Sequence, residues 1–237
     1  MIKKQPLDEF EEIRLLEDLF QHIVPKYHEA HDIMTSLLDF ETGKEIRVAD
    51  LGCGFGDLTR RIIDAFPLSI VFGIDNQSPI LERTREKFRD STEQVVFFER
   101  DLNNTAWVND LNHLHAVVSS FALDYMTEER HKAIIQEAYD KLEPGGRWVS
   151  CEFFRSQDSR INRVFHDLEV SFIQGALKDE RISGEQLDQL GSSTILRREH
   201  HICTVDQKLS WLKEIGFSNV DAPWRFLNLA IISGVRE

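Results

Sequence analysis

The chain has 237 residues, of which 41% are hydrophobic and 29% are charged, and its formal net charge at pH 7 is −13. This length and composition are typical of one globular domain, so we expect residues 1–237 to form a single domain. The acidic balance disfavours nonspecific binding to nucleic acid or to an anionic membrane surface, and no apolar run is long enough to span a bilayer.

The N-terminal residues lead into acidic ones without an apolar signal core, so we expect a cytoplasmic protein. The cysteines are scattered and form no C-x-x-C pattern, so they indicate neither a disulfide framework nor a metal site. They are Cys53, Cys151 and Cys203.

Residues 1–43 predict two helices ahead of the first strand. Apolar residues recur at helical spacing from Leu7 to Phe20, Pro25 ends this stripe, and residues 27–40 predict a second helix. Because these helices precede the sheet, we expect them to cover the carboxyl ends of the strands, where open α/β sheets bind ligands. The alternative is simple packing on the flank of the domain.

Residues 46–51 predict a short buried strand that leads into a glycine turn and a helix. This is the opening unit of a nucleotide-binding α/β domain. A dinucleotide fingerprint would require glycine at position 57, where Asp57 stands. The carboxylate of Asp50, just before the turn, would repel a diphosphate and attract a cationic ligand. The glycines permit a tight turn and a close approach of ligand to backbone; they are Gly52, Gly54 and Gly56.

The D-x-G-x-G-x-G pattern of residues 50–56 closely resembles motif I of the class I S-adenosylmethionine-dependent methyltransferases. S-adenosylmethionine carries an ammonium and a sulfonium and no phosphate, which suits the acidic flank of the turn. The resemblance implies a Rossmann-like α/β fold with a seven-stranded, mostly parallel sheet whose last strand is antiparallel. It also implies S-adenosyl-L-methionine as the cofactor. The alternative is a glycine-rich turn that binds nothing.

The next two predicted strands also end in acidic residues. The strand at 69–74 ends at Asp75, about twenty residues past the turn, where an acid can accept ribose hydroxyls. A capping role for Asp75 or Ser78 is the alternative. The strand at 95–99 precedes Asp101 and Leu102. The family resemblance implies that this aspartate meets the adenine amino group and that the leucine packs near the ring, whereas Asp101 could also serve as a turn residue.

Strands at 115–120 and 147–152 follow, separated by a helix at 128–142 and a turn at 143–146. We expect Ser119 and Ser120 to border the sulfonium. Substrate-side candidates lie on the N-terminal cover and after these strands, and each could instead be a surface, packing or capping residue: His31, Asp124, Tyr125 and Glu152. No catalytic residue is assigned, because methyl transfer needs a general base only when the acceptor arrives protonated.

Residues 155–203 interrupt the alternation of strands and helices. An amphipathic helix is predicted from Ile161 to Ile173, followed by a short helix, and the segment is too long for a simple connection. We expect a lid or dimer element here, so a homodimer is one expectation. Basic residues at 197–201 form either a solvated face or a grip for an anionic substrate. A final helix at 204–215, capped by Thr204 and Gly216, precedes a hairpin at 219–235, disturbed near Pro223.

Within the superfamily the chain looks most like the carboxy-S-adenosylmethionine synthases. The match covers residues 24–27, 51–53 and 74–76, the insertion, and residues 216–217. That resemblance implies cofactor contacts from Tyr27, Asp75, Asn76 and Ser120. Two features differ. The turn keeps three alternating glycines where that family has Cys-Ser after the first, and residues 189–193, where that family uses an arginine to bind a carboxylate, contain no arginine; Arg197 and Arg198 lie nearby but out of register.

The sequence thus predicts a cytoplasmic, S-adenosylmethionine-dependent methyltransferase that acts on a small molecule. Alternatives are a carboxy-S-adenosylmethionine synthase-like enzyme that uses prephenate, and a noncatalytic cofactor-binding protein. The predicted cofactor-binding residues are Tyr27, Asp50, Gly52, Cys53, Gly54, Gly56, Asp75, Asn76, Asp101, Leu102, Ser119 and Ser120.

Overall fold

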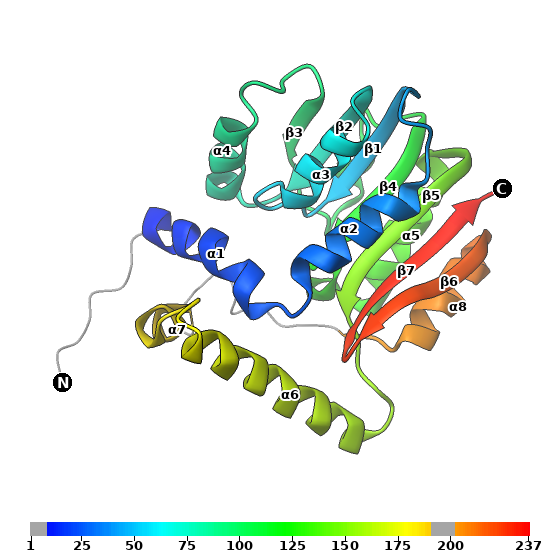
Figure 1. The fold of residues 1–237 in the computed structure, drawn as a ribbon. Coiled ribbons are helices and arrows are strands. Elements are labelled where there is room, and N and C mark those ends of the chain that lie inside the picture. Colours follow the sequence, from blue (N-terminus) through cyan, green and yellow to red (C-terminus); the bar gives the residue numbers. More distant parts are fainter. Residues whose placement is uncertain (1–8, 191–201) are drawn as a thin grey trace.

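The computed structural model describes residues 9–190 and 202–237, which contain one seven-stranded sheet in the order β3-β2-β1-β4-β5-β7-β6 (Figure 1). Neighbouring strands are parallel from β3 to β5, and β7 is antiparallel to both of its neighbours. The expected Rossmann-like α/β fold with an antiparallel last strand is therefore confirmed. The strands are β1 (Ile46–Leu51), β2 (Ser69–Asp75), β3 (Val95–Glu99), β4 (Leu114–Ser120), β5 (Leu142–Phe153), β6 (Phe217–Phe226) and β7 (Leu229–Arg236).

The order of the strands reverses between β1 and β4. The chain runs outward from β1 through β2 to β3, returns to β4 on the other side of β1, and continues to β5. Leu51, at the end of β1, is paired with Ile74 and Ser119, so the three strands end at the same level. In open α/β sheets this reversal creates a crevice at the carboxyl ends, where ligands bind.

Helices cover both faces of the sheet because alternate residues of its buried strands point in opposite directions. Val48 of β1 packs in one apolar cluster with α2 (Tyr27–Leu38) and α3 (Asp57–Ala65), whereas Ala49 packs in another with α5 (Glu128–Lys141) and α8 (Val205–Ile215). Between β2 and α5 the chain also forms α4 (Ser78–Lys87) and the short η1 (Thr105–Val108) and η2 (Leu123–Tyr125).

The sequence left open whether the two N-terminal helices cover the ends of the strands or pack on the flank of the sheet, and the structure shows one helix in each position. Leu16 and Phe20 of α1 (Glu9–Ile23) line a cavity at the carboxyl ends of the strands. In contrast, Met34 and Leu38 of α2 are buried in the apolar cluster on the flank of the sheet. The cover is thus α1 together with the first turn of α2, and the rest of α2 is a flank helix (Figure 1).

The structure corrects the predicted boundary between α5 and β5. The turn expected at 143–146 belongs to β5, which begins at Leu142, where it pairs with Leu114. The ladder is irregular after this pair and resumes with Ala116 opposite Arg147. Leu142 is buried where it pairs with Leu114, and Gly145, with a φ of 80°, lies in the irregular part of the ladder that follows.

The C-terminal elements follow the prediction closely. Thr204 and Gln207 form a reciprocal capping box at the start of α8, and Gly216 ends the helix with a φ of 118°. Strand β6 starts directly after this glycine, two residues earlier than expected. The β6–β7 register shifts between Asp221 and Trp224, around the proline that the sequence marked as a disturbance.

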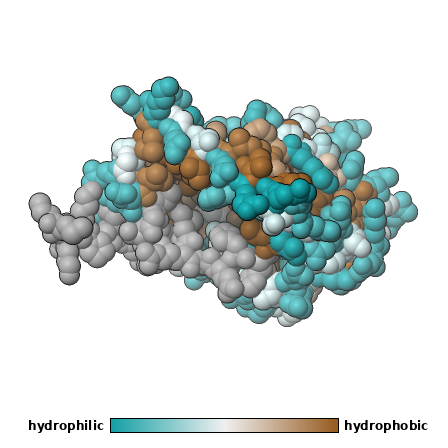
Figure 2. Space-filling view, turned by 90° about the horizontal axis from the view of Figure 1, so that it is seen from below, coloured by the Kyte–Doolittle hydropathy of each residue, from teal (hydrophilic) through white to brown (hydrophobic). Residues whose placement is uncertain are grey.

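The insertion after β5 consists of α6 (Ser159–Lys178) and α7 (Gly184–Leu190). The end of α6 packs on α1, where Leu19, Ala176 and Ile182 form a small apolar cluster. Ile161, Val164 and Leu168 of α6 remain 43–53% exposed, and Figure 2 views the molecule from this side. Two segments singled out in the sequence lie outside the described residues. They are the basic residues at 197–201 and residues 191–193, which belong to the region where the resembling family binds a carboxylate.

Candidate functional site: a cavity at the carboxyl edge of the sheet

A cavity of about 190 Å³ opens where β1, β2 and β4 end, beneath α1 and the first turn of α2. The residues predicted to bind cofactor or substrate come from six separate segments, and the fold brings most of them to this cavity. Those that line it are Tyr27, His31, Asp50, Gly52, Cys53, Gly54, Asp75, Asn76, Asp101, Leu102, Ser120 and Tyr125.

The glycine turn has the conformation that its sequence requires. Gly52 and Gly54 have φ values of 68° and 49°, in the left-handed region that side chains resist. A Cβ added at Gly52 would lie 2.2 Å from the Cβ of Ala122, so this glycine allows the loop after β4 to approach. A Cβ at Gly54 would meet no atom closer than 4.0 Å, which leaves space beside the backbone for a ligand.

Asp50 is the most deeply buried acid of the cavity, with 1% of its surface exposed. The hydroxyl of Thr59 donates a hydrogen bond of 2.6 Å to its carboxylate. Burial raises the pKa of Asp50 to about 7, the hydroxyl opposes this shift, and the nearby charge of Asp75 adds to it. A cationic group placed in the cavity would stabilise the ionised form.

Asp75 connects the glycine turn to the start of α4. One carboxylate oxygen accepts a hydrogen bond of 3.0 Å from the backbone N–H of Gly54, and the other accepts one of 2.9 Å from that of Gln77. Asp75 therefore orders the backbone on both sides of the cavity while it also lines it. Ser78, the other capping candidate, donates instead to Glu99 at 2.9 Å.

Asp101 likewise makes hydrogen bonds within its own turn and also lines the cavity. Its carboxylate accepts hydrogen bonds of 2.9 Å from both the backbone and the side-chain amide of Asn103, as expected of a turn residue. Leu102, which is 6% exposed, lies next to it in the wall of the cavity. Both readings of Asp101 are thus compatible with the same geometry.

Tyr27 and His31 form the aromatic wall beneath α1. The hydroxyl of Tyr27 donates to Asp57 at 2.8 Å, and its ring is stacked on Phe121 with centroids 5.9 Å apart. The Nε2 atom of His31 lies 2.8 Å from the hydroxyl of Ser120. Burial lowers the pKa of His31 to about 3, so its imidazole is neutral at pH 7.

Two predicted cofactor residues lie behind the cavity wall rather than in it. The hydroxyl of Ser119 is buried and donates to the carbonyl of Leu51 at 2.9 Å, because successive strand residues point to opposite faces and Ser120 takes the cavity side. Gly56 is the N-cap of α3, where an added Cβ would lie 2.6 Å from the Phe88 ring. These two residues shape the wall from behind.

Asp124 and Glu152, expected on the substrate side, also lie outside the cavity lining. Glu152 is directed to the face covered by α5 and α8, where its carboxylate is 2.8 Å from the ammonium of Lys208 and 3.3 Å from His131. Asp124 accepts a hydrogen bond of 3.3 Å from the backbone of Phe153. Burial raises the pKa of Asp124 well above its usual range, and the charge of Glu152 adds to this shift.

Sequence reasoning missed much of the apolar lining. Leu16 and Phe20 read as an ordinary helix stripe, and only the placement of α1 brings them to the cavity. Phe121 also lines it and has a φ of 56°, a strained conformation that is frequent at functional sites and that no sequence pattern announced. Further lining residues that the sequence did not indicate are Phe55, Asp57, Leu58, Gln77, Ile80, Arg100, Ala122 and Met126.

The charged side chains of this lining are mostly acidic. Asp50, Asp57, Asp75 and Asp101 face a single lining cation, Arg100. The guanidinium of Arg100 already binds the carbonyl of Trp107 at 3.1 Å, the carbonyl of Asn109, and the carboxylate of Asp110 at 3.1 Å. Such a lining suits a ligand with cationic and hydroxyl groups and opposes a diphosphate.

Comparison with known proteins agrees with this chemistry. A family model described as "Methyltransferase domain" matches residues 48–146, which run from β1 to the start of β5. The carboxy-S-adenosyl-L-methionine synthase of Mannheimia succiniciproducens is 27% identical over 225 residues, covering 92% of this chain and 88% of that protein. The synthase of Glaesserella parasuis serovar 5 is 28% identical over 220 residues, covering 89% and 85%.

Solved structures show the same fold. The S-adenosylmethionine-dependent methyltransferase SibL, in its apo form, aligns with a TM-score of 0.57 and 23% identity. The alignment covers 93% of this chain and 59% of SibL, so the chain spans little more than half of that protein. Residues 48–146 thus match a methyltransferase domain, the fold is that of class I methyltransferases, and the chain resembles the carboxy-S-adenosyl-L-methionine synthases; these findings support an S-adenosylmethionine-dependent methyltransferase with S-adenosyl-L-methionine as its cofactor.

Proposed function

We propose that this protein transfers a methyl group from S-adenosyl-L-methionine to a small neutral or cationic acceptor in the cavity at the carboxyl edge of the sheet. The observation that carries the proposal is the convergence of Asp50, the glycine turn, Asp75 and Asp101 on one cavity. The open space beside Gly54 and the acidic lining fit a cofactor that carries an ammonium group, a sulfonium and ribose hydroxyls.

Each segment of the lining would hold one part of the cofactor. Asp50 and the turn at Gly52 and Gly54 would bind the amino acid end, Asp75 with Asn76 the ribose, and Asp101 with Leu102 the adenine. Ser120 and Tyr27 would lie near the reacting end. When bound, the cofactor supplies a methyl group on a positively charged sulfur, so the protein needs chiefly to bind, orient and exclude water.

The acceptor class follows from charge and enclosure. An anionic acceptor would meet four carboxyl groups and an arginine that is already occupied, at a Coulomb cost. The aromatic wall of Tyr27, His31 and Phe121 instead favours an acceptor with a planar or apolar portion. The cavity lies under α1, which favours a small molecule over a polymer.

The ribose assignment has a direct test. Asp75→Ala should weaken the binding of S-adenosylhomocysteine at least tenfold, because hydrogen bonds to charged groups contribute about 1.5–3 kcal/mol. Isothermal titration calorimetry on wild type and variant measures this effect. Glu99→Ala is the matched control, since Glu99 pairs with Ser78 near the end of β3 and does not line the cavity. Equal affinity of Asp75→Ala and wild type would show that the ribose assignment is wrong.

A second candidate function is supported by the curated relatives, which are named carboxy-S-adenosyl-L-methionine synthases. Such chemistry would use prephenate, and the basic residues that could bind its carboxylates, Arg197 and Arg198, lie outside the described residues. Incubation with S-adenosylmethionine and prephenate, followed by mass spectrometry of the cofactor, separates the two functions. A carboxylated cofactor would favour the synthase, and an unchanged cofactor would count against it; methylation of an added acceptor would then separate methyl transfer from cofactor binding without turnover.

A further inference from the structure

Helix α1 covers the cavity but is attached to the rest of the protein in two different ways. On one side Leu19 packs with Ala176 and Ile182 of the insertion in an apolar cluster. On the other side Leu16 and Phe20 line the cavity itself, and the Phe20 ring lies edge-on to Tyr27 with centroids 5.8 Å apart. A ligand bound in the cavity would therefore lie against α1.

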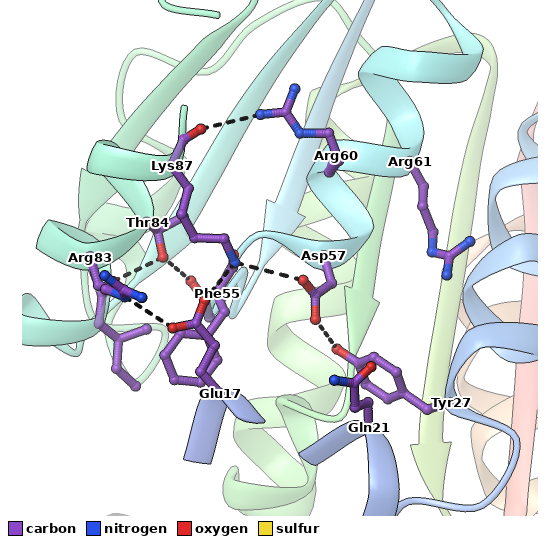
Figure 3. A network of polar contacts seen from close by, with 12 residues as sticks. Glu17, Gln21, Tyr27, Phe55, Asp57, Arg60, Arg61, Arg83, Thr84 and Lys87 are labelled. Atoms are coloured by element: carbon purple, nitrogen blue, oxygen red, sulfur yellow. Dashed lines mark hydrogen bonds and ion pairs between the residues drawn. The ribbon is translucent and has the colours of Figure 1, made fainter. Parts of the chain in front are cut away.

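The other kind of attachment is polar: Glu17 of α1 makes a pair of ionic contacts with α4 (Figure 3). One carboxylate oxygen accepts a hydrogen bond of 3.0 Å from Nε of Arg83, and the other lies 2.9 Å from Nζ of Lys87. Both basic residues belong to α4, across the glycine turn from α1. The Glu17 side chain is only 17% exposed, so solvent screens these contacts less than it would on an open surface.

Lys87 continues the network from α1 into the cofactor site. Its ammonium donates a hydrogen bond of 2.9 Å to the carbonyl of Phe55 in the glycine turn, and it lies 3.9 Å from the carboxylate of Asp57. Asp57 in turn accepts the hydrogen bond from Tyr27. Phe55, Asp57 and Tyr27 all line the cavity, so one connected set of contacts joins the helix above the site to the turn below it.

The charge state of Glu17 agrees with this geometry. Burial alone would raise the pKa of Glu17, but the hydrogen bonds from Lys87 and Arg83 lower it below its ordinary value. The carboxylate is therefore ionised at neutral pH, and both basic partners face it. Between α1 and α2 the chain turns at Lys26, whose φ of 61° is in the left-handed region, directly after Pro25.

We propose that α1 is the lid of the cofactor cavity and that Glu17 is its latch: the ion pairs with Arg83 and Lys87 hold the lid closed, and their opening limits the rate at which the cofactor and its product exchange. The apolar cluster with the insertion is the hinge side of the lid. Glu17 is a positioning residue, because it acts through Lys87 and is not among the residues that line the cavity. This inference rests on the proposed assignment of the cavity as the cofactor site.

The test is stopped-flow measurement of S-adenosylhomocysteine binding to the full chain. Glu17→Gln removes the charge but keeps the size of the side chain. It should accelerate both association and dissociation roughly fivefold, as expected for the loss of two partly exposed ion pairs, while the dissociation constant changes less than about twofold. Arg83→Gln, which removes one of the two partners, should give a smaller acceleration of both rates. Asp18→Asn is the matched control: this exposed acid of the same helix acts on Arg83 only through its more distant charge, so the change should alter both rates much less than Glu17→Gln does.

Salt gives an independent readout. Added salt should accelerate dissociation from the wild type, because screening weakens the latch, and should have less effect on Glu17→Gln. Unchanged rates in Glu17→Gln, or weaker affinity with an unchanged association rate, would overturn the latch. If the wild type does not bind S-adenosylhomocysteine at all, the cofactor site itself is wrong, which is a different failure from that of the latch.

Discussion

Two buried carboxyl groups, Asp50 and Glu152, lie near the carboxyl edge of the same sheet, yet their surroundings differ. Asp50, at the end of β1, faces the cavity, and its side chain accepts a hydrogen bond from the neutral Thr59. Glu152, near the end of β5, faces α5 and α8 and is paired with Lys208 and His131. Both residues are 1% exposed.

The pKa values of the two carboxyl groups shift in opposite directions, because only Glu152 has a cationic partner. Burial raises the pKa of Asp50 to about 7, and the acids around it add to the shift. Burial acts in the same direction on Glu152, but the charge of Lys208 and the contact with His131 bring its pKa well below the usual range. The difference teaches that Glu152 has its cation within the protein, whereas Asp50 is suited to receive one from a ligand.

The largest effect is expected when Glu152 loses its partner. Lys208→Met should destabilise the protein by about 3–5 kcal/mol, because it leaves a buried carboxylate without its cation. Urea unfolding at pH 7 measures the loss. Lys213→Met, at an exposed position of the same helix, is the control and should change the free energy of unfolding by less than about 0.5 kcal/mol.

The double variant Lys208→Met/Glu152→Leu sharpens the comparison, because it removes both charges. It should recover much of the stability lost in Lys208→Met, since apolar replacements of a buried pair are often tolerated. If Lys208→Met costs no more than Lys213→Met, the Lys208–Glu152 pair does not stabilise the folded state.

The next effect concerns pH and the cavity carboxyl group. Because the pKa of Asp50 is about 7, the unliganded protein holds a proton there in mild acid, and binding of a ligand's ammonium group beside the carboxylate must displace it. The affinity for S-adenosylhomocysteine should therefore rise with pH, by up to about tenfold per unit below pH 7, and level off above it. Calorimetry between pH 5.5 and 8.5 measures the profile, with the titration range chosen to bracket a pKa of about 7.

Asp50→Asn is the control for this pH profile, because it removes the titrating carboxyl group and leaves Glu152 in place. The variant should bind the ligand roughly tenfold more weakly at pH 8 and show no rise with pH. It should not be less stable at pH 8, since a raised pKa in the folded state stabilises the protein only at low pH, and this contribution is lost as the pH rises through about 7. A pH profile that persists in Asp50→Asn would assign the titration to another group.

The smallest expected effect separates the two adjacent serines of β4. Ser119→Ala removes a buried hydrogen bond to Leu51 and should cost about 1 kcal/mol of stability while leaving the affinity for S-adenosylhomocysteine unchanged within about twofold. Thermal unfolding and calorimetry measure the two quantities. A large loss of affinity with unchanged stability would show that Ser119 contributes to cofactor binding.

Local sequence patterns correctly predicted those features of the fold that are set by residues close together in the chain. The glycine turn, the capping of α8 by Thr204 and Gly216, and the disturbance near Pro223 all follow from backbone requirements of single residues. The start of β5 was misjudged for the opposite reason. Pro144 and the two glycines after it read as a turn, but pairing of Leu142 with Leu114 extends the strand.

The acidic end of each strand was also readable, because the carboxyl ends of parallel strands meet at one edge. Asp50, Asp75 and Asp101 reach the cavity for that reason. Glu152 was assigned to the same edge by the same argument. Its side chain lies elsewhere, because a strand directs successive residues to opposite faces and the register of β5 decides which face each one takes.

The sequence by itself determined the class of fold, the position of the turn and the cationic character of the expected ligand, since these depend on backbone conformation and on charge next to it in the chain. Only the tertiary structure decided which acids are paired and what covers the cavity. Glu17 meets Arg83 across 66 positions of the chain, and Lys208 meets Glu152 across 56. Such contacts depend on how helices pack, which no local pattern encodes, and packing also sets the burial that raises one carboxyl pKa and the pairing that lowers the other.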